Sequence, residues 1–341
     1  MAKKLRAVLA GCGGMSGAWL TPAKANKNLE IVGLVDIREE SAQKRKDEFG
    51  FASAQTGTSL AAVLKAVKPD IVFDCTIPAA HVDVTLTALR HGCHVLGEKP
   101  MAENLADARR MAKAAQKAGK LYAIIQNRRY TPSIRALRGL IAKGTLGKIT
   151  TLNSDFYIGA HFGGFRDEMR HVLLVDMAIH TFDMARYIAG ADPVSVYCKE
   201  WNPSGSWYAH DASAIAIFTM SNGLVFTYRG SWCSEGMNTT WEGDWRAVCE
   251  NGSVTWDGAD KISAQVVTKR GEFFSKTKPV EVPIPADGKP VGHAALINEF
   301  VDCVRLGKTP QTICTDNIKS FAMVMAALES SESGKVEKVK F

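Results

Sequence analysis

The tripeptide Glu98-Lys99-Pro100 places a lysine where a parallel strand is expected to end. Residues 94–97 are typical of a short buried strand, and Asn104 is a suitable N-cap for the next helix. Ligands of open α/β sheets bind in the crevice beyond the carboxyl ends of the strands. Pro100 disfavours a helical backbone at Lys99. This spacing predicts a lysine on a stiff loop beside a ligand crevice, although most such tripeptides are simple exposed turns.

A second group of polar residues lies in a segment that is otherwise apolar. Asp176 and His180 stand four residues apart, and Asp183 follows three residues later, so all three share one face of an α-helix. Charges in a buried position are costly unless they are paired or used. A carboxylate one turn from an imidazole can orient the ring and shift its pKa, as a general acid or base requires. We therefore expect proton transfer at Asp176 and His180; a histidine that only packs in the core is the alternative.

A glycine-rich turn follows the first predicted strand and opens a helix. Gly11 permits the tight turn, and Gly13 lets the backbone approach a pyrophosphate at the helix N-terminus. Ser16 stands in place of the third glycine and is small enough for close helix–strand packing. Asp36 ends the second strand, where an acidic residue bonds an adenosine ribose and favours NAD. Arg38 could instead meet the 2′-phosphate of NADP, so both cofactors stay open.

Further cofactor contacts are expected at the ends of later strands. Thr76 and Pro78 suit a loop along the nicotinamide half of a dinucleotide, and His81 begins the next helix. His81 is equally well interpreted as a solvent-facing residue. The predicted cofactor-binding residues are Gly11, Gly13, Gly14, Met15, Ser16, Asp36, Arg38, Thr76, Ile77, Pro78, His81, Glu98, Lys99 and Gln126.

Strand-like and helix-like patterns alternate over the first 125 residues, which is typical of a parallel sheet with crossover helices. Strands are predicted at 5–10, 29–35, 71–75, 93–96 and 121–125. Helices are predicted at 17–25, 41–49, 60–67, 80–91 and 105–118, the last ended by Gly119. The fold class is therefore α/β, with an N-terminal doubly wound Rossmann domain over residues 1–127.

After Arg128 the pattern changes to a helix at 132–142 and then to longer β-patterned segments. Asn222-Gly223 and Asn251-Gly252 each separate two such segments, which strongly indicates hairpins. Residues 128–341 are expected to form an α+β substrate domain with a large, mostly antiparallel, open-faced sheet, and its C-terminal helices could pack back on the first domain. The predicted strands are 148–157, 194–200, 212–220, 224–232, 245–250, 253–256, 262–268 and 280–284, and the last helices are 293–306 and 317–330.

Substrate contacts are expected from residues 126–130 and from the loop between Tyr157 and Arg170. Arginines are usually solvated surface residues, but several beside one pocket would suit an anionic substrate such as a sugar acid. The predicted substrate-binding residues are Lys99, Arg128, Tyr130, His161, Arg166, Arg170, Asp176 and His180.

Composition narrows the class of protein. The 341 residues suggest about two domains, and the net charge of +7 comes from scattered lysines and arginines, which disfavours a nucleic-acid or membrane surface. No long apolar segment indicates a secretory signal or a membrane span. Eight single cysteines with no Cys-x-x-Cys pair argue against bound metal and disulfides, and fit reduced thiols in a cytoplasmic protein.

Taken in chain order, the motifs Gly11-x-Gly13, Thr76 with His81, Glu98-Lys99-Pro100 and Asp176-x-x-x-His180 resemble the glucose–fructose oxidoreductase / inositol dehydrogenase (Gfo/Idh/MocA) family. The resemblance implies nicotinamide-dependent redox chemistry on a sugar or cyclitol. It implies that Lys99 contacts the substrate hydroxyl and the nicotinamide ribose, while Asp176 and His180 serve the proton transfer. It also implies a homodimer or homotetramer formed through the C-terminal sheet. Ser16 departs from the commoner glycine pattern of the family.

Two other functions are compatible with part of this pattern. A redox glycosidase would use NAD to oxidise a sugar carbon transiently and so eliminate an aglycone. A non-catalytic dinucleotide-binding regulator would keep the glycine turn and Asp36, but it has no need of Lys99, Asp176 and His180 together.

Overall fold

The computed structural model describes residues 3–271, 273–286 and 288–341. The chain separates into two compact units, the first formed by residues 1–127 and 289–318 and the second by residues 128–288 and 319–341. Helix α8 (Gly292–Leu306) packs against α1 (Ser16–Ala25) and β5 (His94–Gly97), and for this reason residues 289–318 belong to the first unit. The second unit is thus formed by two stretches of the chain, on either side of residues 289–318.

Unit 1 is built on a six-stranded parallel sheet in the order β3-β2-β1-β4-β5-β6. This is a doubly wound parallel sheet, the class that the sequence predicted, and its switch point lies between β1 and β4. In sheets of this kind the chain segments that leave the two strands at the switch point diverge, and ligands bind in the crevice between them. The remaining strands are β1 (Leu5–Ala10), β2 (Leu29–Val35), β3 (Gln55–Gly57), β4 (Ile71–Asp74) and β6 (Tyr122–Ile124).

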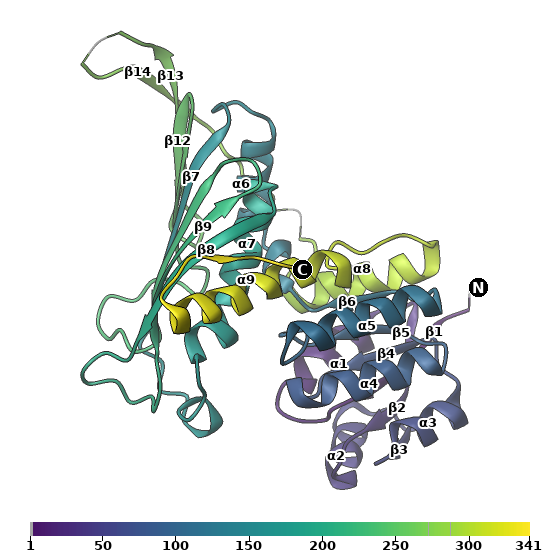
Figure 1. Cartoon of the computed structure of the whole chain (residues 1–341). Coiled ribbons are helices and arrows are strands. Elements are labelled where there is room, and N and C mark those ends of the chain that lie inside the picture. Colours follow the sequence, from purple (N-terminus) through teal and green to yellow (C-terminus); the bar gives the residue numbers. More distant parts are fainter. Residues whose placement is uncertain (1–2, 272, 287) are drawn as a thin grey trace. The chain divides into compact units, whose positions relative to one another are not determined.

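Helix α5 (Leu105–Ala118) begins and ends at residues that local rules favour. The Asn104 side chain accepts a hydrogen bond from the Asp107 N–H at 2.9 Å and caps α5, which ends at Gly119 with a left-handed φ of 62°. Trp19, Phe73 and Phe300 are fully buried and fill the core. The other helices of this unit are α2 (Glu39–Phe49), α3 (Leu60–Val67) and α4 (Pro78–Arg90) (Figure 1).

Unit 2 contains a nine-stranded sheet in the order β14-β13-β12-β11-β7-β10-β9-β8-β15. Its neighbouring strands are antiparallel except for the parallel pair β10 and β7. The two predicted Asn-Gly hairpins connect β9 to β10 and β11 to β12. The strands are β7 (Ile149–Tyr157), β8 (Pro193–Trp201), β9 (Ser213–Met220), β10 (Val225–Ser231), β11 (Asp244–Cys249), β12 (Gly252–Trp256), β13 (Ile262–Lys269), β14 (Lys276–Val280) and β15 (Glu337–Lys338).

Helices cover one face of this sheet (Figure 1). They are α6 (Pro132–Ala142), α7 (Ile179–Ala189) and most of α9 (Cys314–Ser333), together with the π-helix η3 (Leu173–Ala178). Phe182 of α7 packs edge-to-face on Phe218 and Tyr228, with ring centroids 4.8 and 5.4 Å away. Short 3₁₀ turns, η1 (Asn127–Tyr130) and η2 (Gly164–Arg166), lie in the connections.

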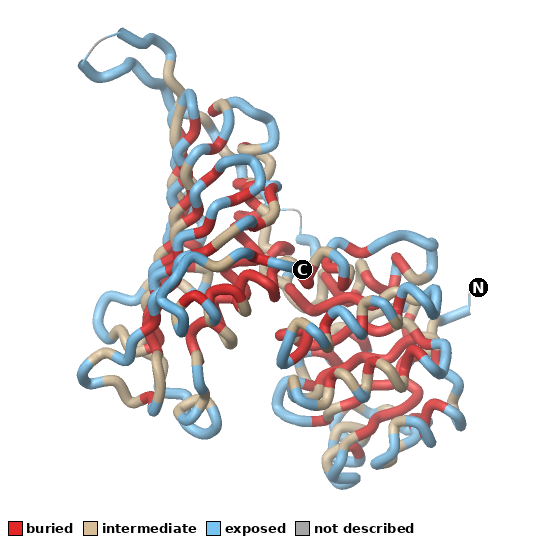
Figure 2. Tube along the Cα trace, in the orientation of Figure 1, coloured by how far each residue is buried: buried red, intermediate tan, exposed pale blue. Residues whose placement is uncertain are grey.

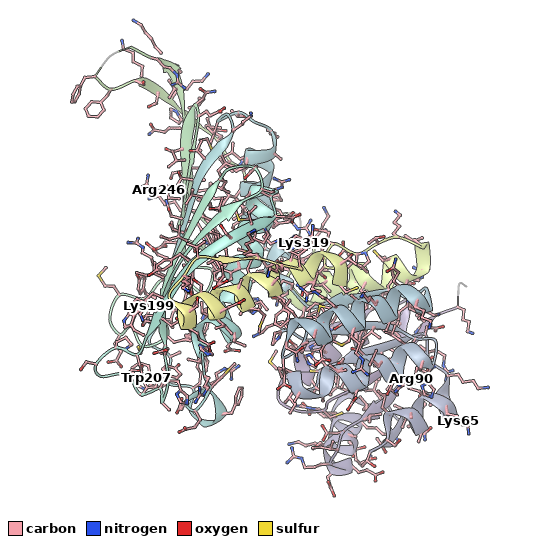
Figure 3. All side chains as sticks on the ribbon, in the orientation of Figure 1. Lys65, Arg90, Lys199, Trp207, Arg246 and Lys319 are labelled. Atoms are coloured by element: carbon pink, nitrogen blue, oxygen red, sulfur yellow. The ribbon has the colours of Figure 1, made fainter. Side chains whose placement is uncertain are left out.

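The opposite face of the nine-stranded sheet is open. Along β8 and β9, buried residues alternate with exposed ones, and the change from red to pale blue along the strands can be followed in Figure 2. Lys199 and Arg246 project from the face away from the helices (Figure 3). Among the described residues, no helix is both long and apolar enough to cross a membrane.

Three strand assignments differ from the expectation. The last strand of the hairpin region runs over Lys276–Val280, so the prediction of a strand at 280–284 is wrong. This edge strand is exposed at almost every position, and it therefore has no apolar alternation to mark its bounds. β3 and β15 are only three and two residues long and were not predicted. All eight cysteines are free in this structure.

Candidate active site

The glycine turn packs tightly on one side and is open on the other. Gly11 has a φ of 91°, and a Cβ there would lie 2.4 Å from the carbonyl oxygen of Cys75. A Cβ at Gly13 or Gly14 would meet nothing within 4 Å. Ser16, in place of the third glycine, is fully buried and donates its Oγ–H to the Gly13 carbonyl at 2.6 Å. The turn therefore leaves room for a phosphate group against its backbone at the start of α1.

Asp36 is fixed by backbone donors at the end of β2. Its Oδ2 accepts the Cys12 N–H at 2.8 Å, and its Oδ1 accepts the Arg38 N–H at 2.9 Å. The Arg38 side chain is exposed and makes no polar contact within the described part of the chain. Arg45 of α2 donates to the Gly13 carbonyl at 2.9 Å and adds a positive charge beside the glycine turn.

Large apolar side chains are left exposed around this turn. Met15 is 52% exposed, Ile77 after β4 is 69% exposed, and Ile37 after β2 is 91% exposed. Exposed apolar groups gathered with polar anchors are typical of ligand sites. They follow strands whose carboxyl ends lie at the switch point, and so the residues present fit a flat-ringed dinucleotide.

The end of β4 is organised around a buried carboxylate. Thr76 donates both its N–H, at 3.1 Å, and its Oγ1–H, at 2.5 Å, to Oδ1 of Asp74, and burial raises the pKa of Asp74. His81 is 1% exposed, which excludes the solvent-facing interpretation. Its Nδ1 lies 3.0 Å from the Pro100 carbonyl and its Nε2 lies 3.1 Å from the Thr76 carbonyl. Since neutral imidazole has one N–H, both contacts are hydrogen bonds only when the ring is protonated.

Glu98 is anchored from two helices. Its Oε1 accepts the Trp19 Nε1–H at 2.8 Å and lies 3.8 Å from Nε2 of His293 in α8. Asn127 contacts the other nitrogen of His293 at 3.1 Å. Burial raises the pKa of Glu98, but His293, Trp19 and the Lys99 charge outweigh it, and the pKa lies below its ordinary value. Glu98 is thus an anion inside the protein.

Lys99 is the next residue in the chain after Glu98, and Glu98 also holds its backbone. Its N–H donates to Oε2 of Glu98 at 3.1 Å, and the peptide bond to Pro100 is cis. The lysine is half-buried at the carboxyl end of β5, next to the switch-point loops. Gln126, also predicted to bind the cofactor, is fully buried just after β6.

In unit 2 the predicted proton-transfer residues lie where the helix changes its winding. Asp176 belongs to the π-helix η3, and His180 belongs to α7, which continues from it. Arg166 donates from Nε to Oδ2 of Asp176 at 2.8 Å, and its guanidinium lies 4.9 Å from the Phe162 ring centroid and 4.8 Å from that of Phe165. Single π-turns inside α-helices are frequent at functional sites. Asp176 is half-buried, and His180 is 9% exposed.

The other predicted substrate residues have mixed surroundings. Arg128 forms a salt bridge with Glu242, and Nε2 of His161 lies 3.0 Å from Oε1 of Glu235 while its ring stacks on Trp207. Tyr130 is buried under Arg135. Arg170 is exposed and has no polar contact among the described residues. Carboxylates therefore balance most of these cations, which weakens the expectation of an anionic substrate.

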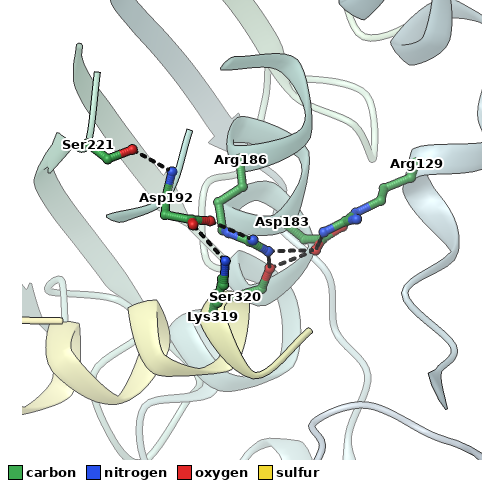
Figure 4. Close-up of polar contacts among 7 residues, drawn as sticks. All are labelled: Arg129, Asp183, Arg186, Asp192, Ser221, Lys319 and Ser320. Atoms are coloured by element: carbon green, nitrogen blue, oxygen red, sulfur yellow. Dashed lines mark hydrogen bonds and ion pairs between the residues drawn. The ribbon is translucent and has the colours of Figure 1, made fainter. Parts of the chain in front are cut away.

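Asp183 on α7 is paired with Arg129, whereas Asp176 is paired with Arg166. Asp183 is fully buried and forms two 2.6 Å hydrogen bonds with Arg129, while Ser320 donates to it at 2.7 Å (Figure 4). Arg186 extends this network to Ser320 and Asp192 (Figure 4). The π-turn changes the helical phase between Asp176 and the residues of α7, and Asp183 is committed to an ion pair within unit 2.

Several residues of the site gave no usable signal in the sequence. Trp19 of α1 and His293 of α8 contact Glu98. Both are far from Glu98 in the sequence, so no local pattern indicates that they lie close to it. Ile37 could have been found, because it directly follows Asp36 at a strand end. Within the described residues, no three His, Cys, Asp or Glu side chains gather as a metal site would need.

The fold and the glycine turn define a two-unit oxidoreductase with a dinucleotide-binding Rossmann sheet. Comparison with known proteins agrees: residues 5–126 match the family model described as an oxidoreductase family with an NAD-binding Rossmann fold, and residues 134–255 match the C-terminal domain of the same family. The chain belongs to the Gfo/Idh/MocA family of oxidoreductases.

Individual relatives are distant. The chain is 33% identical over 192 residues to the D-glucoside 3-dehydrogenase of Escherichia coli, a match that covers 54% of each protein. It is 25% identical over 354 residues to the D-apiose dehydrogenase of Paraburkholderia graminis, covering 99% of this chain and 90% of the relative. Among solved structures, an Agrobacterium radiobacter oxidoreductase in complex with NAD+, L-tartaric acid and magnesium superposes with a TM-score of 0.86 at 20% identity, over 99% of both chains.

Proposed function

We propose that this oxidoreductase is an NAD(P)-dependent dehydrogenase that transfers a hydride between nicotinamide and a ring hydroxyl carbon of a sugar, sugar derivative or cyclitol. The observation that carries the proposal is Lys99, fixed by the anchored anion Glu98 at the carboxyl end of β5, in a sheet whose glycine turn and Asp36 suit a dinucleotide. Two relatives named for sugar substrates support the substrate class.

The chain's own residues would manage the hydroxyl proton and the charge on oxygen. Bound NAD(P) would supply the nicotinamide carbon that exchanges the hydride. His180 serves as the base when the alcohol is oxidised and as the acid in the reverse direction. Lys99 stabilises negative charge that develops on the substrate oxygen. Asp176, held by Arg166, orients the site.

We further propose that NAD is preferred over NADP. Asp36 is held by two backbone N–H groups in a position suited to accept ribose hydroxyl hydrogen bonds, and its charge would repel a 2′-phosphate. Arg38 and Arg45 are the cations that would oppose this preference. An Asp36→Ser variant should lower the ratio of the kcat/KM for NAD to that for NADP, and an unchanged ratio would contradict the proposal.

The test of the reaction is NADH or NADPH formation with a panel of sugars, inositols, sugar acids and glycosides. His180→Ala should lower kcat by roughly 10²–10⁴-fold if His180 performs acid–base catalysis. His210→Ala is the matched control, because His210 lies in the same unit and makes no polar contact among the described residues. Cleavage of a glycoside without net NADH formation would favour a redox glycosidase. Dinucleotide binding without turnover on any substrate would favour a regulator.

We also propose that a second copy of the chain covers the open face of the nine-stranded sheet, giving a homodimer or homotetramer. Tyr197, Ile215 and Ile217 are between 40% and 44% exposed on this face. A hollow of about 730 Å³ on the same face is lined by charged residues, including the ion pair Asp155–Arg229. A mixed apolar and charged face suits an isologous interface, in which each side carries both partners of a contact.

Ile217→Arg would place like charges opposite each other at or near such a two-fold interface. We expect the mass measured by light scattering to fall from a multiple of 37.0 kDa to 37.0 kDa. Thr268→Arg, on an exposed position of β13 outside the hollow, is the control. A monomeric wild-type chain would refute the proposal.

A further inference from the structure

His171 has an unusual backbone conformation at the entrance to the helix that carries Asp176. Its φ is 54°, and it is one of two non-glycine residues with positive φ in the described part of the chain; the other, Lys68, ends α3. A left-handed backbone is unfavourable for residues with a Cβ and persists where surrounding contacts fix it. The next residue begins the helix that becomes η3, and the His171 carbonyl accepts the Val175 N–H at 3.0 Å.

The contacts that fix this conformation come from two other elements of unit 2. Nδ1 of His171 lies 2.8 Å from Oε2 of Glu200 on β8, and Nε2 lies 3.8 Å from Oε1 of Glu332 on α9. Glu200 is 3% exposed, and its own N–H donates to Ser331 Oγ at 3.0 Å. The imidazole therefore ties the start of η3 to a strand and to a helix.

The surroundings of His171 favour its charged form. The groups that face it are the carboxylates Glu200, Glu332 and Asp211, and its hydrogen bond to Glu200 raises the pKa of the imidazole. Burial raises the pKa of Glu200, which His171 partly offsets. Because the folded-state pKa of His171 is raised, its stabilising effect is complete below the unfolded value of about 6.5 and is lost as the pH rises through the folded value.

We propose that His171 is a positioning residue: as an imidazolium bound to Glu200 and Glu332, it holds the left-handed turn that starts η3 and thereby fixes Asp176 and His180. Loss of the proton weakens the tie and loosens the segment from 172 to 180. The consequence for catalysis rests on the proposed function, whereas the tie itself does not. The chain thus contains a pH-sensitive contact that is separate from the groups proposed to transfer the proton.

Hydrogen exchange of the amides in 172–180, followed by mass spectrometry, tests the tie without any substrate. In His171→Gln we expect roughly 10- to 100-fold faster exchange at pH 6 than in the wild type, as for loss of a hydrogen bond between charged groups. The difference should shrink at pH 9, after correction for the intrinsic exchange rate. His171→Arg, which keeps its charge, should retain protection at both pH values. His210→Gln is the control and should exchange like the wild type.

A second variant separates the tie from a general loss of folding. His171→Gly adopts the left-handed backbone without strain but lacks the imidazole, so it should fold and still exchange rapidly over 172–180. Wild-type protection in both His171→Gln and His171→Gly at pH 6 would overturn the proposal, whatever their activity. A chain that shows the pH-dependent exchange but oxidises no polyol would overturn the proposed function and support the tie.

Discussion

The pair Arg129–Asp183 offers a demanding test of how unit 2 is held together. Asp183 is fully buried and the Arg129 side chain is 7% exposed, and two hydrogen bonds of 2.6 Å join them. Removing Asp183 takes both of these hydrogen bonds and the neutralising carboxylate from the buried Arg129 guanidinium. Asp183→Ala should therefore lower the free energy of unfolding by about 3–5 kcal/mol.

The assay is urea denaturation followed by tryptophan fluorescence. Six of the seven tryptophans lie in unit 2 and only Trp19 lies in unit 1, so the signal reports chiefly on the unit that carries the pair. With a urea dependence of about 2–3 kcal/mol per molar, the midpoint should fall by roughly 1–2 M.

The double variant Arg129→Met/Asp183→Leu supplies the control. Replacing both partners with apolar residues of similar volume removes the stranded charge, and such replacements are often neutral or stabilising. We expect the double variant to be more stable than Asp183→Ala, because it has no buried guanidinium that has lost its carboxylate. A loss below about 1 kcal/mol in Asp183→Ala would refute the reasoning, because breaking a buried ion pair by removing one partner is expected to cost several times that amount.

Three further outcomes are expected. Gly11→Ala should destabilise unit 1 in thermal unfolding, because its Cβ would lie 2.4 Å from a backbone oxygen at a φ of 91°; a wild-type melting temperature would contradict this. Gly13→Ala, with open space around its Cβ, should fold normally but bind NADH more weakly in a fluorescence titration, and unchanged affinity would argue against a pyrophosphate there. Trp19→Phe removes one hydrogen bond to the Glu98 anion and should lower the free energy of unfolding at pH 7 by about 1.5–3 kcal/mol. Because the pKa of Glu98 is depressed, this contribution is present above about pH 4.3 and is lost as the pH falls through the folded value, so wild type and Trp19→Phe should converge in acid.

Local signals in the sequence predicted much of the fold. The cap at Asn104, the end at Gly119 and the hairpin at Asn222-Gly223 all occur as expected, since each depends on a few neighbouring residues. β14 was misplaced because an edge strand exposed on both faces has no periodicity. The return of α8 to unit 1 was only an open alternative, because its apolar face does not specify its partner.

The residues of the candidate site also fall into two groups, those that local sequence predicts and those that depend on contacts between distant parts of the chain. Gly11, Asp36 and Lys99 were predicted because their spacing from strand ends is a local property of the chain. The π-turn at Asp176 was not, since an i, i+4 spacing indicates an α-helix unless tertiary contacts impose another winding. The contact of His171 with Glu200 and that of His293 with Glu98 join residues distant in the chain, and no local pattern records them.

The return of α8 also affects the order in which this protein can fold during its synthesis. Glu98 and His293 are 195 positions apart, and α8 packs on α1, which is made near the beginning of the chain. At 5–20 residues per second the ribosome needs roughly 10–40 s to reach His293 after it has added Glu98. Throughout that interval the surface of α1 that α8 will cover is without its partner, while the 161 residues from 128 to 288 emerge. The nascent Rossmann unit therefore cannot be completed until α8 has been synthesised. During this interval its uncovered surface is most able to misassemble or to bind chaperones.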